Sequence, residues 1–368
     1  MKTLKIVLII ILCGIMLFLG GFLAFALKTD RRGWNTTPNG LTGNYELVLN
    51  EEVSAEGINS LSVQYGMNSN DVFFFEGTED KIVIKEYLNF TPEENEISTI
   101  QNKDGELVVK GKKRDGFFSF GFFGGRDGYV EIYLPSGFAG NLSVATVSGD
   151  IRTERDFVQM GQLRLSSTSG DICFTKIEAD SVRISTVSGE IRAAELIGNA
   201  DLSTTSGDIR LEQTKGDLSV STTSGEITIA NRNGKLNADT TSGDIRVDVA
   251  DGAFSINTVS GEVTVGDGCG FGTVGTTSGD IRVFLKELQG DFSVSTVSGE
   301  VSLALPSDAA FDFSFHSVSG ECNTFFDDEL SFNKKGTDAD GTHGSGSNLP
   351  KVKISGTSGD LRITEYQQ

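Results

Sequence analysis

The sequence predicts an all-β protein, a β-solenoid (single-stranded β-helix) with two strands and about 18 residues in each coil. Three observations predict this fold class. A short motif recurs at a nearly constant spacing, apolar and polar residues alternate on both sides of it, and no helical periodicity follows Leu27. Alternation with a period of two, interrupted by Gly and Asn, is typical of short strands joined by turns.

The recurring motif has the core [TV]-S-G-[DE] and occurs eleven times. From Glu190 to Asp280 successive copies are evenly spaced, and the flanking intervals are longer by one to three positions. The last interval, from Glu321 to Asp360, fits two coils with one disguised, or one coil with an insertion. The acidic residues of the motif are Asp150, Asp171, Glu190, Asp208, Glu226, Asp244, Glu262, Asp280, Glu300, Glu321 and Asp360.

One repeat shows how a coil is built. The segment 218–222 alternates apolar and polar residues, Ser224 and Gly225 form a turn, and the segment 226–229 alternates again. A unit of this size cannot bury its own apolar face, so the repeats must stack. In parallel register, inward ladders then form from Leu218, Val220, Ile227 and Ile229. An antiparallel β-sandwich is the alternative, but the near-identity of successive repeats favours the solenoid.

The N-terminus predicts a transmembrane helix that acts as a signal anchor. A short tail, 1–5, precedes the uncharged segment 6–27, which is long enough to cross a hydrocarbon core of about 30 Å. A cleaved signal peptide is the alternative, because residues 24–26 (Ala-Phe-Ala) have the form of a cleavage site. The apolar run exceeds the roughly 7 to 15 residues usual in signal peptides, which favours the anchor.

The orientation in the membrane is less strongly specified. Two lysines precede the apolar run, and Lys28, Arg31 and Arg32 follow it, so the positive-inside rule is nearly balanced. The export-like N-terminus and the acidic remainder favour a short inner tail and a large domain outside the cytoplasm. We therefore expect a single-pass membrane protein.

The rest of the chain divides by pattern. A linker at 28–43 leads to a β-rich cap region at 44–140, which lacks the motif. Solenoid repeats follow at 141–324, then an irregular, flexible insertion at 325–350 and a final coil at 351–366. A cap covers the open end of a solenoid and prevents edge-to-edge pairing.

The cap region contains a Phe-rich loop at 112–125, in which three basic residues precede a cluster of aromatic residues. Aromatic and basic residues together suit an element that enters the headgroup region of an anionic membrane. The alternative is a hydrophobic hairpin folded over the end of the solenoid. The candidate membrane-contact residues are Phe117, Phe118, Phe120, Phe122 and Phe123.

Composition limits the classes of partner. The chain has 51 acidic and 31 basic residues and a net charge of −20, which argues against nucleic acid as a partner. Its four cysteines are far apart and show no CxxC spacing, so neither a disulfide framework nor a zinc site is indicated. We expect no cofactor.

The charged residues of the motif predict structural ladders. If Ile245 and Val247 face inward, Asp244 and Arg246 face outward, and stacking builds a column of carboxylates beside a second column. Like charges opposite one another destabilise a sheet, and arginines in the second column offset this repulsion. These arginines are Arg152, Arg192, Arg210, Arg246, Arg282 and Arg362. A row of calcium sites is the alternative, although arginine beside the carboxylates competes with a cation.

No catalytic residue is indicated. A serine nucleophile needs a base, yet the only histidines are His316 and His343, and eleven equivalent motif serines cannot all be catalytic. Evenly repeated carboxylates also lack the singular arrangement that sugar hydrolysis requires. A carbohydrate-active β-helix enzyme and a self-assembling envelope filament are the alternatives.

The segments INSLSVQYG, DKIVIKEYLNF and YVEIYLP, followed by repeated TVSGDI and TTSGDI, carry a family resemblance. Over about residues 55–366 the chain resembles the bacterial "putative adhesin" family of β-strand-repeat proteins, domain of unknown function 4097. The resemblance implies a β-solenoid at the cell envelope and brings no catalytic residues. We expect a non-enzymatic protein of the bacterial cell membrane that serves adhesion, envelope scaffolding or stress sensing. Its expected partners are the membrane and a cell-wall glycan or a protein.

Overall fold

The computed structural model describes residues 45–66, 70–77, 80–112 and 127–366. The chain divides into two units, Met1–Asn44 and Tyr45–Gln368, and the account below concerns the second. The predicted span at 6–27 and all five phenylalanines of the Phe-rich loop lie outside the described residues. None of the helices in the described ranges has the length and apolar character needed to cross a membrane.

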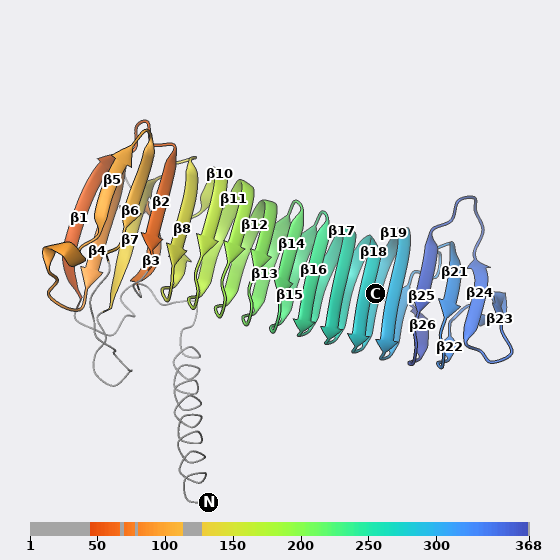
Figure 1. Ribbon diagram of the computed structural model, residues 1–368. Helices are drawn as coiled ribbons and strands as arrows, with labels where there is room; N and C mark the ends of the chain where they lie inside the picture. The colour runs from red at the N-terminus through yellow and green to blue at the C-terminus, as the bar shows by residue number, and fades with distance from the viewer. Residues whose placement is uncertain (1–44, 67–69, 78–79, 113–126, 367–368) are drawn as a thin grey trace, which may run out of the picture. The chain divides into compact units, whose positions relative to one another are not determined.

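The all-β prediction is confirmed. Apart from two 3-10 turns, η2 (Glu94–Glu96) and η3 (Asp327–Glu329), every regular element in the described part of the chain is a strand. Each repeat contributes one strand that follows the motif and one strand that precedes the next motif, and we call this pair a coil. Strands of successive coils lie side by side (Figure 1).

The strands that follow the motif form one sheet together with β1, β3, β4 and β7 of the cap region, and we call its outer surface the charged face. Their order in space is β1 (Glu46–Ser54), β4 (Lys81–Leu88), β7 (Gly128–Pro135), β3 (Asn70–Gly77), β9 (Ile151–Thr153), β11 (Ile172–Ser185), β12 (Ile191–Ser203), β13 (Ile209–Lys215), β15 (Ile227–Asn233), β17 (Ile245–Ser260), β18 (Val263–Ser278), β19 (Ile281–Ser298), β20 (Val301–Leu305), β26 (Leu361–Glu365) and β22 (Cys322–Asn323).

The strands that precede the motif form the second sheet, to which the long strands β11, β12, β17, β18 and β19 contribute their second halves. Its other strands, in spatial order, are β5 (Thr99–Lys103), β6 (Glu106–Lys110), β2 (Ser60–Tyr65), β8 (Asn141–Thr146), β10 (Phe157–Ser166), β14 (Leu218–Thr222), β16 (Leu236–Ser242), β25 (Lys351–Ser355), β21 (Phe311–His316), β24 (Asp338–His343) and β23 (Leu330–Phe332).

Repeats pair in parallel at the spacing of the motif. Ile209, Ile227, Ile245 and Val263 are successive partners, each one motif interval after the last, and all four side chains are fully buried. Identical positions therefore stack into inward aliphatic ladders, because every second side chain of a strand faces the core. These strands pair in parallel, whereas the alternative, an antiparallel β-sandwich, requires antiparallel pairs.

At both ends the order in space differs from the order in the sequence. β2 and β3 precede β6 and β7 in the chain, yet they lie between that pair and β8 and β9. At the other end, β25 and β26 lie between β19–β20 and β21–β22 (Figure 1). The coil expected to be last, 351–366, is therefore inserted one coil inside the end of the stack.

The insertion at 325–350, expected to be irregular, contains η3, β23 and β24. β24 pairs antiparallel with β21 and β23 pairs antiparallel with β24. Phe326 packs edge-on against Phe311 and Phe313 at centroid distances of 5.3 and 5.4 Å. The Gly- and Asp-rich sequence suits this hairpin because the strands lie at the outer edge of the sheet. At the opposite end, β1, β4 and β5 are the antiparallel strands.

Candidate functional site

The turn of the motif is built by close backbone approach. A Cβ atom at Gly243 would lie 2.0 Å from the carbonyl oxygen of Gly225 in the adjacent coil, so only glycine fits. Beside this turn, Thr258 Oγ1 donates to the carbonyl oxygen of Gly243 at 3.1 Å. The same bond to the adjacent coil recurs from Ser167, Thr186, Thr204, Thr222, Thr240 and Thr276. The inner hydroxyl and the glycine of the motif thus hold successive coils together.

The aspartates of the motif bind the backbone of the adjacent coil, a role that the sequence analysis missed. Asp208 Oδ1 accepts a hydrogen bond from the Glu226 backbone N–H, at an N–O distance of 2.9 Å. Asp244 accepts the Glu262 N–H at 2.8 Å. Asp150, Asp171, Asp280 and Asp360 accept the N–H of the acidic residue in the adjacent coil in the same way. Asp is short enough to place its carboxylate against that N–H.

The arginines form the second column, as the register requires. Arg210 bonds Glu190 and Asp208, at 2.8 Å from the latter, and lies 3.9 Å from Glu226. It therefore contacts carboxylates of its own coil and of both neighbours. Arg282 bonds Glu262 and lies 3.3 Å from Asp280.

The hydrogen bond from Arg282 lowers the pKa of the Glu262 carboxyl below its ordinary value. Arg152 pairs with Asp150, and Arg192 pairs with Glu190. These two pairs are partly buried, whereas Arg282 and Glu262 are more exposed, and exposed pairs contribute only about 0.2–1 kcal/mol each.

Two arginines depart from the expected ladder. Arg246 Nε lies 2.7 Å from Asp248 Oδ1 on its own strand, and Asp244 is not its partner. Arg362 makes no ion pair with any residue in the described part of the chain. Cys173 occupies the arginine position between Arg152 and Arg192, and burial raises the pKa of its thiol to about 12.

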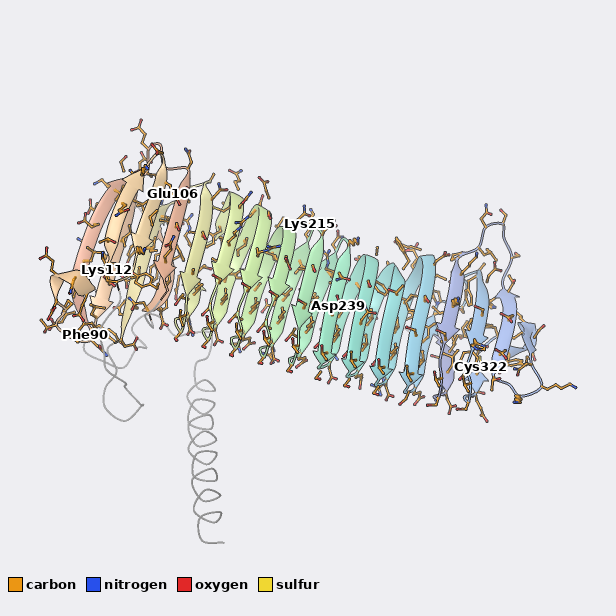
Figure 2. The ribbon with its side chains drawn as sticks, in the orientation of Figure 1. Phe90, Glu106, Lys112, Lys215, Asp239 and Cys322 are labelled. Atoms are coloured by element: carbon orange, nitrogen blue, oxygen red, sulfur yellow. The ribbon has the colours of Figure 1, made fainter. Side chains whose placement is uncertain are left out.

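Seen in spatial order, the charged face alternates with a period of two coils from the Asp208 coil onward. Side chains project outward from every coil (Figure 2). The alternating pairs are Asp208/Arg210, Glu226/Thr228, Asp244/Arg246, Glu262/Thr264, Asp280/Arg282, Glu300/Ser302, Asp360/Arg362 and Glu321/Asn323. In chain order Glu321 follows Glu300 and breaks the pattern. The inserted coil with Asp360 restores it.

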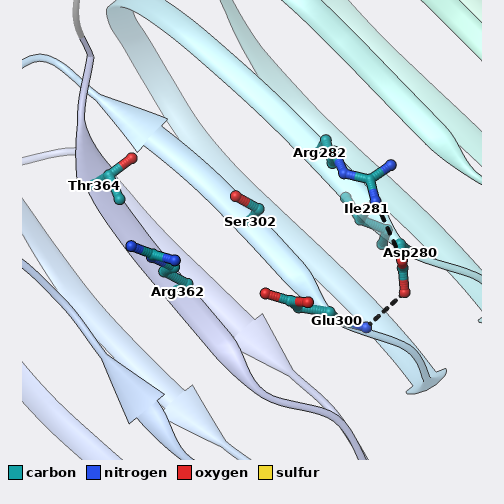
Figure 3. Close-up of a pocket in the computed structure, with 7 residues that line it drawn as sticks. All are labelled: Asp280, Ile281, Arg282, Glu300, Ser302, Arg362 and Thr364. Carbon is teal, nitrogen blue, oxygen red and sulfur yellow. Dashed lines mark hydrogen bonds and ion pairs between the residues drawn. The ribbon is translucent and has the colours of Figure 1, made fainter.

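A short side chain between two arginine coils leaves a hollow on the charged face. One hollow, of about 200 Å³, lies over Ser302, between Arg282 and Arg362 (Figure 3). Glu300 and Asp280 lie at one end of it and Thr364 at the other. The hollow offers guanidinium, carboxylate and hydroxyl groups to a polar ligand. Among the residues described, no group of three or more His, Cys, Asp or Glu side chains is placed to hold a metal ion.

Comparison with other proteins adds the family. Solved structures that match over most of the chain include a "putative adhesin" from Parabacteroides distasonis, at 15% identity and a TM-score of 0.34, covering 88% of this chain and 98% of that one. A "putative lipid binding protein" from the same organism matches at 14% identity and a TM-score of 0.32, with coverage of 88% and 98%. A "putative cell adhesion protein" from Clostridium sporogenes matches at 11% identity and a TM-score of 0.21, with coverage of 88% and 99%. Among curated proteins, no sequence matches the chain.

The family model matches most of the chain. It covers residues 58–267 and 250–364, which include every copy of the motif. The cap strands β2, β3, β6 and β7, which lack the motif, lie within the same match. The chain therefore belongs to the Toastrack DUF4097 family.

Proposed function

We infer that this protein is a membrane-anchored β-solenoid, exposed outside the bacterial cytoplasm, that acts as an adhesin or envelope scaffold and catalyses no reaction. The observation that supports this function best is the two-coil repeat of the charged face. The same set of acidic residue, arginine and short polar residue recurs from Asp208 to Asn323, which suits a partner that is itself repetitive. Many weak, equivalent contacts give high avidity without a deep cleft.

The topology is tested with cells that produce the full chain with a C-terminal tag. Protease is added to intact cells, and the tag is followed by immunoblotting. We expect the tagged domain to be degraded while a cytoplasmic control protein survives. A protected tag would place the domain inside the cell and overturn the proposal.

Adhesion is tested by retention of the same cells on immobilised peptidoglycan and on matrix proteins, against cells that lack the chain. Replacement of Arg210, Arg246 and Arg282 by Ala should reduce retention far more than any single replacement, because multivalent contacts multiply. The matched control replaces Arg164, Arg183 and Lys353 by Ala, because these basic side chains are exposed on the other sheet. Equal retention of cells with and without the chain on every surface would overturn the adhesin role.

A further inference from the structure

A second surface, away from the repeats, carries an unusual group of aromatic residues. Four of the six tyrosines of the chain lie on β4, on β7 and just before β1. Ile82, Ile84, Val130 and Ile132 on these strands are fully buried, so the alternate residues face outward. We call the outward group the tyrosine face, and it consists of Tyr45, Leu47, Phe73, Phe75, Tyr87, Tyr129 and Tyr133.

The rings of the tyrosine face contact one another across strands. Tyr87 and Tyr129 stack at 4.6 Å between centroids with an angle of 12° between planes. Phe75 and Tyr133 stack at 5.1 Å and 26°. Tyr45 packs edge-on against Tyr129 at 5.2 Å. These are favourable aromatic geometries, so the rings support one another in a fixed arrangement.

The tyrosine hydroxyls also bond to carboxylates of the protein. Tyr133 Oη donates to Glu131 Oε2 at 3.0 Å, and Glu131 is 8% exposed. Tyr87 bonds the same carboxylate, and Tyr45 Oη donates to Asp127 at 3.5 Å. These hydrogen bonds fix the tyrosine side chains before any ligand arrives. Binding to their ring carbons therefore costs little further side-chain entropy.

The tyrosine face is accessible in part. Tyr45, Phe75, Tyr87, Tyr129 and Tyr133 are half-buried. Leu47, the cross-strand partner of Tyr87, is 51% exposed and extends the apolar surface beside the rings. An exposed aromatic patch on a folded domain marks an interaction site.

The charge around the tyrosine face selects the partner. Asp127 and Glu131 bond the tyrosine hydroxyls, and the chain as a whole carries −20. Lys85 Nζ lies 4.7 Å from the centroid of the Tyr133 ring and offsets part of this charge. An anionic lipid surface or a nucleic acid would still be repelled. A neutral glycan matches the surface, because a sugar ring has an apolar C–H face that packs on an aromatic ring and hydroxyls that donate to carboxylates.

We propose that the tyrosine face is a binding surface for a neutral glycan, which packs the apolar C–H faces of its sugars against the outward ring surface that Tyr87, Tyr129 and Tyr133 form together. The proposal names a partner class for the envelope protein proposed above and rests on that function for its biological setting. Binding itself is measured on the purified full chain in detergent, whatever its membrane topology. Failure of glycan binding and failure of the topology experiment are therefore distinguishable.

The test uses uncharged oligosaccharides of defined linkage: chitohexaose, cellohexaose, laminarihexaose and maltoheptaose. Affinity is measured by calorimetry, and NMR of the tyrosine-labelled protein reports the contact surface. At least one sugar should bind and shift the resonances of Tyr87, Tyr129 and Tyr133, while Tyr65 and Tyr366 stay unchanged. If none of the sugars shifts these resonances, the proposal is wrong. A shift produced instead by anionic phospholipid added to the detergent micelles would also overturn it.

Two variants localise the binding. Replacement of Tyr87 and Tyr129 by Ala should weaken binding by at least about tenfold, because the glycan loses the aromatic surface on which it packs. Replacement of both by Phe keeps the rings and should retain most of the affinity, which separates a lost contact from a misfolded cap. The matched control replaces Phe271 and Phe284, each 38% exposed on other coils, and should bind like the unmodified chain. Unchanged affinity in the Ala variant would contradict the proposal.

Discussion

The choice between aspartate and glutamate in the motif has a geometric basis at the scale of single residues. Asp244 isolates this effect, because its carboxylate accepts the Glu262 N–H at 2.8 Å while Arg246 pairs with Asp248. Replacement of Asp244 by Glu should lengthen the side chain past this N–H and cost about 0.5–1.5 kcal/mol. Replacement by Asn keeps the acceptor oxygen and should cost less. Thermal unfolding measures both, and equal stability of the Glu variant and the unmodified chain would contradict this role.

The column of inner hydroxyls is interrupted at Gly356 in the inserted coil. Thr296 and Ser317, in the coils on either side, are buried, and their hydroxyls have no hydrogen-bond partner among the described residues. A Cβ atom at Gly356 would lie 3.7 Å from Ser317 Oγ, which is an ordinary contact. Gly356→Ser should therefore raise stability by about 1 kcal/mol, through a new hydroxyl partner and a less flexible unfolded chain.

The control for this prediction is Gly359→Ala in the same coil. Gly359 has a φ of +134°, and its Cβ would lie 2.0 Å from the carbonyl oxygen of Gly299. This variant should lose stability strongly. A lower melting temperature for Gly356→Ser would show that the gap in the column has another cause.

The tyrosines of the tyrosine face should lose their protons at a higher pH than tyrosines in the unfolded chain. Burial, followed by nearby carboxylates, raises the pKa of Tyr45 and of Tyr87 to about 12, and raises that of Tyr129. A tyrosine in the unfolded chain titrates near 10. The fold favours the neutral phenol, so this stabilisation is complete below pH 10 and is lost as the pH rises from 10 towards 12.

Absorbance of tyrosinate against pH measures this directly. The folded chain should show a late step that Tyr87→Phe reduces, whereas the chain in urea should titrate near pH 10. Early titration of all tyrosines in the folded chain would contradict the burial of the phenols.

At the scale of strands and coils, the sequence predicts much of the architecture. Alternation around Leu218 and Ile227 predicts two strands per repeat, and the constant spacing predicts their parallel register, which the pairs of Ile209, Ile227 and Ile245 display. The neighbours of the end coils could not be predicted in this way, because alternation shows which residues form a coil and says nothing of which coils pair. A usable signal was present: Glu321 directly after Glu300 breaks the Asp/Glu alternation, and a coil with Asp360 between them restores it.

The candidate sites also contain features that the sequence predicts and features that it does not. The positions of the outward columns are predictable, because they follow from the register of the strands. The bonds from Asp side chains to backbone N–H groups and the pairing of Arg246 with Asp248 depend on side-chain length and rotamer. The tyrosine face is assembled from β1, β3, β4 and β7, whose adjacency follows no repeat.

The two-coil period predicts how deletions behave. Removal of two repeats, 226–261, joins the Asp208/Arg210 coil to the Glu262/Thr264 coil and keeps the alternation. Removal of a single repeat, 226–243, places Arg210 beside Arg246 and Asp208 beside Asp244. Like charges in neighbouring strands cost about 0.2–1 kcal/mol per pair, so the shorter deletion should be the less stable protein. Thermal unfolding followed by circular dichroism compares the two, and the reverse order would contradict the electrostatic role of the columns.

At the scale of the whole stack, the inserted coil makes the C-terminus essential. β25 and β26 each pair on both sides, so a chain that ends at residue 350 leaves the edges of β19, β20 and β21 unpaired. Unpaired edges recruit other chains. This truncation should aggregate in size-exclusion chromatography, whereas removal of Gln367 and Gln368 alone should not. A monomeric, cooperatively folded truncation would contradict the locking role of this coil.

The insertion also decides how the stack resists mechanical load. In a stack whose outermost coil is also the end of the chain, tension on that end peels one ladder of hydrogen bonds at a time. Here a pull on the C-terminus meets β26 held between β20 and β22, and a pull from the N-terminal side that reaches β2 meets a strand held between β6 and β8. Each of these two strands must break two ladders together before it can leave. The edge strand β1 is held by its ladder to β4 alone, so peeling from the N-terminal side can begin at β1, whereas the C-terminus offers no such edge.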